Sequence, residues 1–311
     1  MARPSKPRRS TSSRPARTAK PGTRPVRPAA KTAPRATPAK TAAKKVVRKP
    51  TRSASKAPVA KAAGSKKSSS KGPVRAPSKP ALLEFTEVRS NDVPERAATP
   101  LSIALFGASG DIGSRIAEEA LARGHRVTAL VRNPAQMSGE HPQLKIVRGD
   151  ATDPLQVAVV ARNHDVVASA ISAPPNDLAV IVHAAKALVA GARETGKRVV
   201  AVGGAGSLEV APGKLLLDSA QFPSFVRPVA AAHLDALKVF KEKGDDAPWT
   251  VVSPSAFIEP GRRTGTFRLG TEQLISDKKG NSRISMEDYA VAFVDELERG
   301  DHVGQRMTVG Y

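Results

Sequence analysis

The chain has 311 residues with 50 Lys or Arg, 28 Asp or Glu and no cysteine, so its formal net charge is +22. The absence of cysteine excludes disulfides and thiolate chemistry. No apolar run reaches the roughly 18 residues that a membrane helix needs, and the start lacks the apolar stretch of a secretory signal, so neither feature is expected.

The positive charge is concentrated in residues 1–80, which hold 24 of the 50 basic residues, 13 of the 26 prolines and no acidic or aromatic residue. Residues 81–311 hold the other 26 basic residues and all 28 acidic ones, a net charge of −2. The first segment cannot bury enough apolar surface to offset the entropy of ordering, so it is predicted to be a disordered basic tail. Many cations without aromatic rings suit contact with phosphates, which predicts non-specific binding of DNA or RNA.

Two other interpretations of residues 1–80 stay open. The segment is rich in Arg and Ser and free of acids, as organellar transit peptides are, although its prolines interrupt the amphipathic helix that such peptides need. It could also be a solubilising extension without a function of its own. The nucleic-acid interpretation predicts a cytoplasmic protein that can associate with the nucleoid, and the transit interpretation predicts an organellar protein with a cleaved N-terminus.

Residues 81–100 mix acidic residues with two prolines and are predicted to be a linker, and residues 101–311 suit one α/β domain with a full core. Strand-like and helix-like patterns alternate along this domain. In chain order, we expect strands at 103–106, 126–131, 144–147, 165–171, 197–202 and 249–252. Helices are expected from about 112 onward and at 154–162, 177–194 and 228–243. This alternation predicts parallel βαβ units in a doubly wound Rossmann sheet, with its ligand crevice at the carboxyl ends of the strands.

The last part of the chain, near 255–311, has a different pattern and is expected to form a small C-terminal lobe on the substrate side. We expect a hairpin at 264–277 with its turn at 279–281. A capping-box-like start predicts a helix at 285–298, and residues 306–310 are predicted to form a final strand.

A glycine-rich turn follows the first strand of the domain. The apolar run 103–106 ends at Gly107, Gly110 and Gly113 follow at three-residue intervals, and an amphipathic helix begins there. In dinucleotide-binding proteins such glycines allow the tight turn, the approach of backbone to a pyrophosphate, and close packing of helix on strand. A glycine-rich turn without a ligand is the alternative. We predict cofactor contacts for Gly107, Ser109, Gly110, Asp111, Ile112 and Gly113.

The residue after the second strand indicates which dinucleotide is bound. Proteins that hold the ribose of NAD usually place an acid there, whereas this chain has Arg132. A guanidinium can hold a 2′-phosphate, which favours NADP over NAD unless Arg132 is merely a solvated surface residue. Asp150, after the third strand, could accept a hydrogen bond from the adenine or simply cap its own turn. Ala151, Ala170 and Ile171 complete the predicted cofactor contacts at the strand ends.

Six short motifs lie at the expected strand ends and in the last part of the chain. They are Gly-Ala-Ser-Gly-Asp-Ile-Gly at 107–113, Val-Arg-Asn-Pro at 131–134, Gly-Asp-Ala-Thr-Asp at 149–153, Val-Gly-Gly-Ala-Gly-Ser-Leu at 202–208, Ser-Pro-Ser-Ala-Phe-Ile-Glu-Pro-Gly at 253–261 and Ile-Ser-Met-Glu-Asp-Tyr-Ala at 284–290. Together they resemble the atypical short-chain dehydrogenases, in particular the bacterial NADH-flavin reductase-like group, which is related to biliverdin/flavin reductase and NmrA-like proteins. The resemblance covers about 101–311. It implies an NAD(P)H-binding Rossmann domain that reduces flavins, such as FMN, or quinones. It also implies that the backbone of Pro254 lies beside the nicotinamide, although this proline could simply end its strand.

The chain departs from ordinary short-chain dehydrogenases at their Tyr-x-x-x-Lys pair. Its two tyrosines, Tyr289 and Tyr311, are not followed by Lys at that spacing, which disfavours carbonyl and alcohol chemistry. Two residues remain as catalytic candidates. Ser207 stands where the resemblance places a Ser near the nicotinamide, although it could cap a loop instead. His233 shares a helical face with apolar residues, so a packed core histidine is the alternative. No metal-ligand cluster is evident.

Three hypotheses about function remain. The first is an NADPH-dependent oxidoreductase that reduces flavin or quinone-like acceptors and is held on a polyanion by its tail. The second is an NmrA-like sensor that binds NADP without catalysis. The third is a nucleoid-associated protein with a vestigial Rossmann domain. The oligomeric state is left open.

Overall fold

The computed structural model describes residues 86–89, 99–137 and 139–311, which all lie in one compact unit, residues 77–311. The predicted tail lies outside the described residues, as does most of the predicted linker. Within the described residues, no helix is long and apolar enough to cross a membrane.

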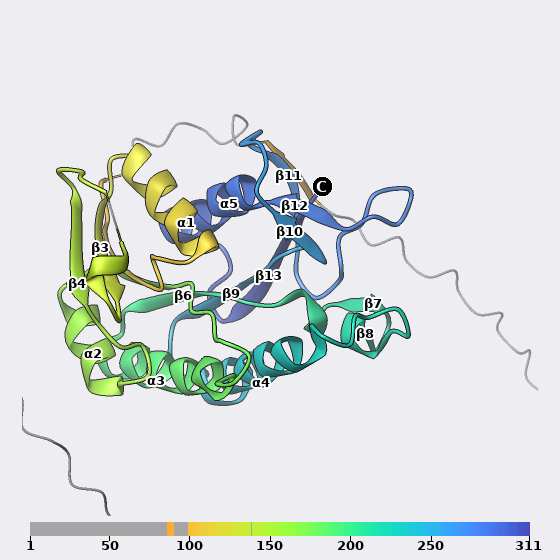
Figure 1. Ribbon diagram of the computed structural model, residues 1–311, viewed down its shortest axis with the longest axis horizontal. Helices are drawn as coiled ribbons and strands as arrows, with labels where there is room; N and C mark the ends of the chain where they lie inside the picture. Colours follow the sequence, from red (N-terminus) through yellow and green to blue (C-terminus); the bar gives the residue numbers. More distant parts are fainter. Residues whose placement is uncertain (1–85, 90–98, 138) are drawn as a thin grey trace, which may run out of the picture. The chain divides into compact units, whose positions relative to one another are not determined.

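A nine-stranded sheet forms the centre of this unit (Figure 1). Its order is β1-β11-β13-β9-β6-β5-β2-β3-β4, and the seven strands from β13 to β4 are parallel, whereas β11 runs antiparallel to both of its neighbours. This confirms the predicted doubly wound α/β class. The strands are β1 (Thr86–Arg89), β2 (Ser102–Phe106), β3 (Arg126–Val131), β4 (Leu144–Arg148), β5 (Val166–Ser169), β6 (Arg198–Val202), β9 (Trp249–Ser253), β11 (Thr266–Gly270) and β13 (Gln305–Gly310).

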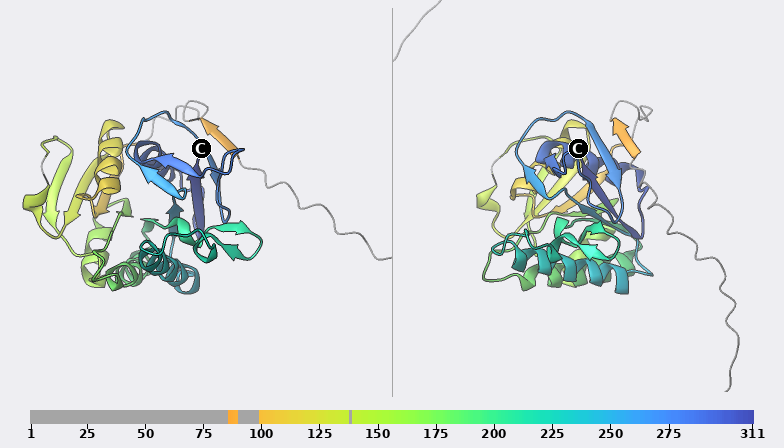
Figure 2. Two further views of the ribbon diagram at one scale, coloured as in Figure 1. Left: turned by 45° about the vertical axis from the view of Figure 1, so that its right-hand side comes forward. Right: turned by 90° about the vertical axis from the view of Figure 1, so that its right-hand side faces the viewer.

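Helices cover both faces of the sheet, as the views of Figure 2 show. α1 (Asp111–Ala122) and α5 (Met286–Arg299) lie on one face, and α2 (Pro154–Arg162), α3 (Ala179–Thr195) and α4 (Arg227–Lys243) lie on the other. Local sequence signals set several helix ends. Asp153 accepts hydrogen bonds from the first backbone N–H groups of α2, and the Ser285 hydroxyl accepts one from Asp288 at the start of α5. Gly196 and Gly300 end α3 and α5 in the left-handed conformation.

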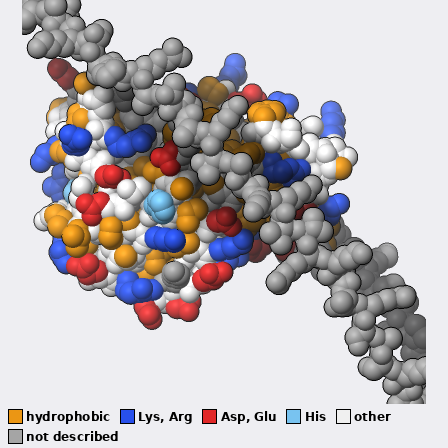
Figure 3. Space-filling model, turned by 60° about the horizontal axis from the view of Figure 1, so that its bottom comes forward, with side chains coloured by type: hydrophobic (Ala, Val, Ile, Leu, Met, Phe, Trp, Pro, Cys, Tyr) orange, Lys and Arg blue, Asp and Glu red, His pale blue; other side chains and the backbone are white. Residues whose placement is uncertain are grey.

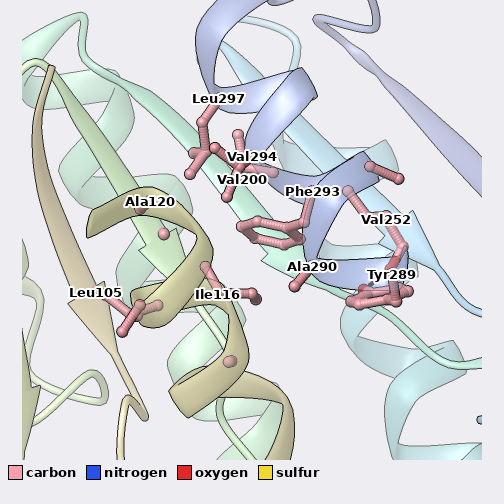
Figure 4. Close-up of a cluster of buried hydrophobic side chains, with 14 of the residues drawn as sticks. Leu105, Ile116, Ala120, Val200, Val252, Tyr289, Ala290, Phe293, Val294 and Leu297 are labelled. Carbon is pink, nitrogen blue, oxygen red and sulfur yellow. Dashed lines mark hydrogen bonds between the residues drawn. The ribbon is translucent and has the colours of Figure 1, made fainter. Parts of the chain in front are cut away.

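The core between the sheet and the α1–α5 pair explains why the central strands are continuously apolar. Residues 103–106 of β2 are fully buried, because a parallel sheet is covered on both faces. Ile116 of α1 and Phe293 of α5 meet above Leu105 and Val200, so the two helices share one core (Figure 4). This packing fixes α1, and with it the glycine-rich turn, on the end of β2.

The last part of the chain differs from the predicted arrangement. The predicted hairpin at 264–277 is wrong, because β11 pairs with β13 and β1 of the main sheet, where Phe267 is buried in the core. The turn near 279–281 exists, with the Asp277 N–H bonded to the Asn281 carbonyl, but it joins no paired strands. β10 (Phe257–Glu259) and β12 (Arg283–Ser285) form a separate parallel pair. Residues 255–311 are thus divided between the main sheet, the helix layer and this small pair.

Three further strands were not predicted. β7 (Glu209–Ala211) and β8 (Lys214–Leu215) form a small hairpin after β6. β1 lies inside the segment predicted as a linker and adds an edge strand to the sheet.

Candidate nucleotide-binding site

A cavity of about 270 Å³ lies at the carboxyl ends of β2, β3 and β5. A doubly wound sheet places its ligand crevice at this edge. The cavity brings together eight of the predicted cofactor-binding residues, namely Gly107, Ser109, Gly110, Arg132, Asp150, Ala151, Ala170 and Ile171.

The contacts that a side chain would make differ among the three glycines of the turn. Gly107 has φ +78°, and a Cβ there would lie 2.5 Å from the Ala170 carbonyl oxygen. A Cβ on Gly113 would lie 2.1 Å from the Gly107 carbonyl oxygen, so α1 can pack on the turn only without a side chain. At Gly110 the nearest atom would be 3.5 Å away, which is ordinary contact. The protein itself therefore has room for a side chain at Gly110, so packing does not explain this glycine, and its contact with a ligand stays a prediction.

The start of α1 suits a phosphate. Gly110 is the N-cap residue, and no side chain caps the first backbone N–H groups of the helix. Uncapped N–H groups and the helix dipole together favour an anion at this point. Asp111 and Ile112, both predicted contacts, form the first turn of α1 but do not line the cavity.

Arg132 and Asp150 line the cavity just after β3 and β4. Arg132 follows β3, is exposed and lines the cavity. Asp150 Oδ1 accepts hydrogen bonds from the Thr152 N–H (2.9 Å) and from its hydroxyl (2.8 Å). These hydrogen bonds, with a smaller contribution from the charge of Arg132, lower the pKa of Asp150. Asp150 Oδ1 therefore caps its own turn, as one of the two interpretations predicted. The lowered pKa keeps the carboxylate ionised in the cavity wall.

Ser207 lies in a short helical turn after β6, away from the cavity lining. It is only 5% exposed, and its hydroxyl donates to the Gly204 carbonyl (3.3 Å) and accepts from Nη1 of buried Arg306 (2.8 Å). Both partners belong to the protein, so the structure assigns this hydroxyl to holding the loop. Its catalytic role stays a prediction.

His233 lies on α4 against the loop after β6. A Cβ on Gly204 would lie 2.9 Å from the His233 Cβ, so the glycine lets α4 approach the strand end. Burial lowers the pKa of His233 to about 4, and the imidazole is therefore neutral at neutral pH. It can exchange hydrogen bonds there but carries no acidic proton to donate as an imidazolium. Pro254 is buried at the end of β9, outside the cavity lining.

Seven residues that line the cavity were not predicted from the sequence. They are Phe106, Leu130, Val131, Gly149, Thr152, Ser172 and Val180. Most of them stand next to a predicted contact at a strand end, and that position was the available signal. Gly149 is explained by packing, since a Cβ there would lie 2.7 Å from Leu130 Cδ2. Val180 belongs to α3, and no local pattern places it beside the turn after β2.

The glycine turn, the uncapped helix start and the strand-end cavity define a dinucleotide-binding Rossmann protein. A sequence model of the family described as NAD(P)H-binding matches residues 107–299. The chain therefore belongs to this NAD(P)H-binding family.

Individual relatives agree with this assignment. The Bacillus subtilis protein YwnB, named as uncharacterized, is 38% identical over 215 residues, which are 67% of this chain and 98% of YwnB. The structure of a Burkholderia pseudomallei protein whose name proposes export is 50% identical and covers 68% of this chain and 100% of its own, with a TM-score of 0.62. A Streptococcus pneumoniae protein whose name proposes an NADH-flavin reductase is 33% identical, covers 68% of this chain and 99% of its own, and has a TM-score of 0.61. These findings confirm the resemblance to the flavin reductase-like group of atypical short-chain dehydrogenases.

Proposed function

We propose that this protein is an NADPH-dependent oxidoreductase that reduces a flavin or a quinone-like acceptor. Its NAD(P)H-binding family and its relatives support an oxidoreductase in general. The observation that carries the finer proposal is the cavity itself, which joins a glycine turn open to a ligand with an arginine at the end of β3, where NAD-binding proteins have an acid.

The residues present fit a dinucleotide along the strand ends. The start of α1 and Gly110 would hold the pyrophosphate, and Arg132 would hold the 2′-phosphate by charge-assisted hydrogen bonds. Ala170, Ile171 and Ser172 at the end of β5 would direct the nicotinamide toward the ends of β6 and β9. The bound nicotinamide supplies a hydride.

The proposed class of acceptor follows from the lack of a positioned proton donor among the candidate catalytic residues. Neither tyrosine has the Lys spacing of ordinary short-chain dehydrogenases, the Ser207 hydroxyl is held by Arg306, and His233 is neutral. Carbonyl reduction needs a positioned proton donor, whereas a flavin or quinone can take its proton from solvent. The contribution of the protein is therefore to position the two rings and to exclude water between them.

The direct test is oxidation of NADPH by the purified full-length protein with FMN, riboflavin or a quinone. Arg132→Ala should weaken NADPH binding about tenfold or more and leave NADH nearly unchanged, because a charge-assisted hydrogen bond is worth about 1.5–3 kcal/mol. Arg126→Ala is the matched control. Arg126 is exposed and begins the same strand, β3, at the amino-terminal end, away from the cavity. Equal losses for both cofactors would contradict the role of Arg132.

The engagement of Ser207 and the neutrality of His233 also favour a second candidate, an NADP-binding sensor without turnover. Saturable NADPH binding with no oxidation in the presence of any acceptor would support the sensor and reject the oxidoreductase.

A further inference from the structure

The strands near the two edges of the main sheet differ in how many charged side chains they carry. An exposed edge strand presents unpaired N–H and C=O groups to other chains, and proteins commonly guard it with charged side chains. The β4 edge follows this rule, because Lys145 and Arg148 are both exposed there. At the other edge β1 is the outermost strand, and β11 lies beside it. Without β1, the edge would be β11, whose sequence is Thr-Phe-Arg-Leu-Gly. Its single charged residue, Arg268, donates hydrogen bonds to the carbonyls of Ser276 and Tyr311.

The β11 strand is also well formed for pairing. Phe267 is 2% exposed and Leu269 packs against the same core, so the strand is held in place by its side chains. β13 pairs with only three of its residues, 268–270. Its outer side pairs with β1 in an unbroken register, from Thr86 opposite Leu269 to Arg89 opposite Thr266.

We propose that the outer edge of β11 is a docking site for an extended strand, filled by residues 86–89 of the same chain, and that this filling keeps two copies from pairing through β11. A covered edge has no unpaired backbone groups to offer, whereas a bare β11, with Arg268 as its one charged residue, could add the β11 of a second copy.

The strand belongs to the part that this chain adds to its family. The family match begins at residue 107, and relatives matched over nearly their whole length cover 67–68% of this chain. In the sequence, residues 86–89 stand between the part that the family model matches and the segment 1–80 with its 24 positive charges. In the sheet order, β1 is at the opposite edge from β3 and β4, whereas the nucleotide cavity lies over β2, β3 and β5. The added segment thus joins the sheet away from the nucleotide.

A pair of introduced cysteines tests the docking directly, because the chain has no thiol of its own. Arg89→Cys with Thr266→Cys, in the full-length protein, should form a disulfide within one chain on mild oxidation. Peptide mass mapping and a non-reducing gel would identify it. Arg89→Cys with Lys145→Cys, at opposite edges, is the control and should form no such bond. A bond joining two chains, or none at the first pair, would overturn docking within the chain.

A second experiment tests the consequence. Glu87→Pro with Val88→Pro removes backbone donors and should increase concentration-dependent association relative to the unmodified protein, measured by size exclusion with light scattering. Asn91→Pro with Asp92→Pro, outside the strand, is the matched control and should associate as the unmodified protein does. Circular dichroism checks that each variant is folded. A folded Glu87/Val88 variant that associates no more than the unmodified protein at any concentration would overturn the protective role of the strand.

Discussion

Substitutions at Gly110 and Gly113, in the same turn, are expected to affect different properties: cofactor affinity at Gly110 and folding stability at Gly113. A Cβ at Gly113 would lie 2.1 Å from the Gly107 carbonyl oxygen, whereas at Gly110 the closest approach is 3.5 Å. Gly113→Ala should therefore destabilise the fold by about 1–3 kcal/mol or more, because the helix must move off the strand end. Gly110→Ala should melt close to the unmodified protein and lose at least tenfold in NADPH affinity.

Thermal melting and cofactor titration of both variants decide between these effects. A Gly110→Ala protein that binds NADPH as tightly as the unmodified one would mean that no phosphate approaches this backbone.

His233 gives a pH dependence of known sign. Its pKa is about 4 in the folded protein and about 6.5 when unfolded, so the unfolded chain takes up a proton first as the pH falls. Stability should decrease between about pH 6.5 and pH 4, by at most about 3 kcal/mol from this residue. Denaturant melts at several pH values should show that the unmodified protein loses more stability over this range than His233→Gln. Parallel losses in both would show that His233 is solvated.

At the scale of elements, a residue of the sheet holds the end of α5. Arg198 of β6 donates to the carbonyls of Glu296 (2.6 Å) and Leu297 at the last turn of the helix. A cationic side chain at a helix C-terminus donates hydrogen bonds to the free carbonyls and interacts favourably with the negative end of the helix dipole. Arg198→Met should therefore cost about 1–3 kcal/mol in unfolding free energy.

Arg162→Met is the matched control for this prediction. Arg162 pairs with Glu194 between two exposed side chains, 54% and 49% exposed, so its loss should cost less than about 1 kcal/mol. Equal costs in urea melts would mean that the Arg198 contacts contribute no more than a surface ion pair.

The elements that the sequence predicted are those with local signals. β3 and α2 were placed to the residue, because periodicity, turn residues and an N-terminal Asp-Pro mark their ends. The partners of β11 depend on contacts with β13 and β1, far apart in the chain, and no local pattern contains them. The prediction of a hairpin at 264–277 was wrong for this reason.

The site divides in the same way. Gly107, Arg132 and Asp150 could be placed because parallel strand ends meet at one edge of the sheet. The capture of the Ser207 hydroxyl by Arg306, ninety-nine residues later, could not be predicted, since nothing near either residue in the sequence signals it.

For the whole molecule, charge separates the two parts of the chain. Residues 1–80 carry a net +24 and residues 81–311 a net −2. The face of the folded part seen in Figure 3 mixes Lys and Arg with Asp and Glu and shows no continuous basic surface. Because the excess positive charge lies in residues 1–80, we expect contacts with nucleic-acid phosphates to come from the tail.

Deletion of residues 1–80 should abolish binding to DNA and leave the rate of NADPH oxidation unchanged. If about ten basic residues contact duplex phosphates, the log–log salt dependence of the full-length protein should have a slope near −9. Fluorescence anisotropy of labelled duplexes measures both. Equal DNA affinity of the two proteins would reject the tail as the tether, and a mature chain that begins near residue 80 in cells would favour a cleaved targeting segment.

Calorimetric titration of the unmodified full-length protein with NADPH and with NADH measures whether the cavity binds a dinucleotide and which of the two it prefers. The structure predicts saturable binding of NADPH at one site per chain, at least tenfold tighter than NADH, because only NADPH carries the 2′-phosphate that Arg132 can hold. The absence of saturable binding by either nucleotide would contradict the account of the cavity.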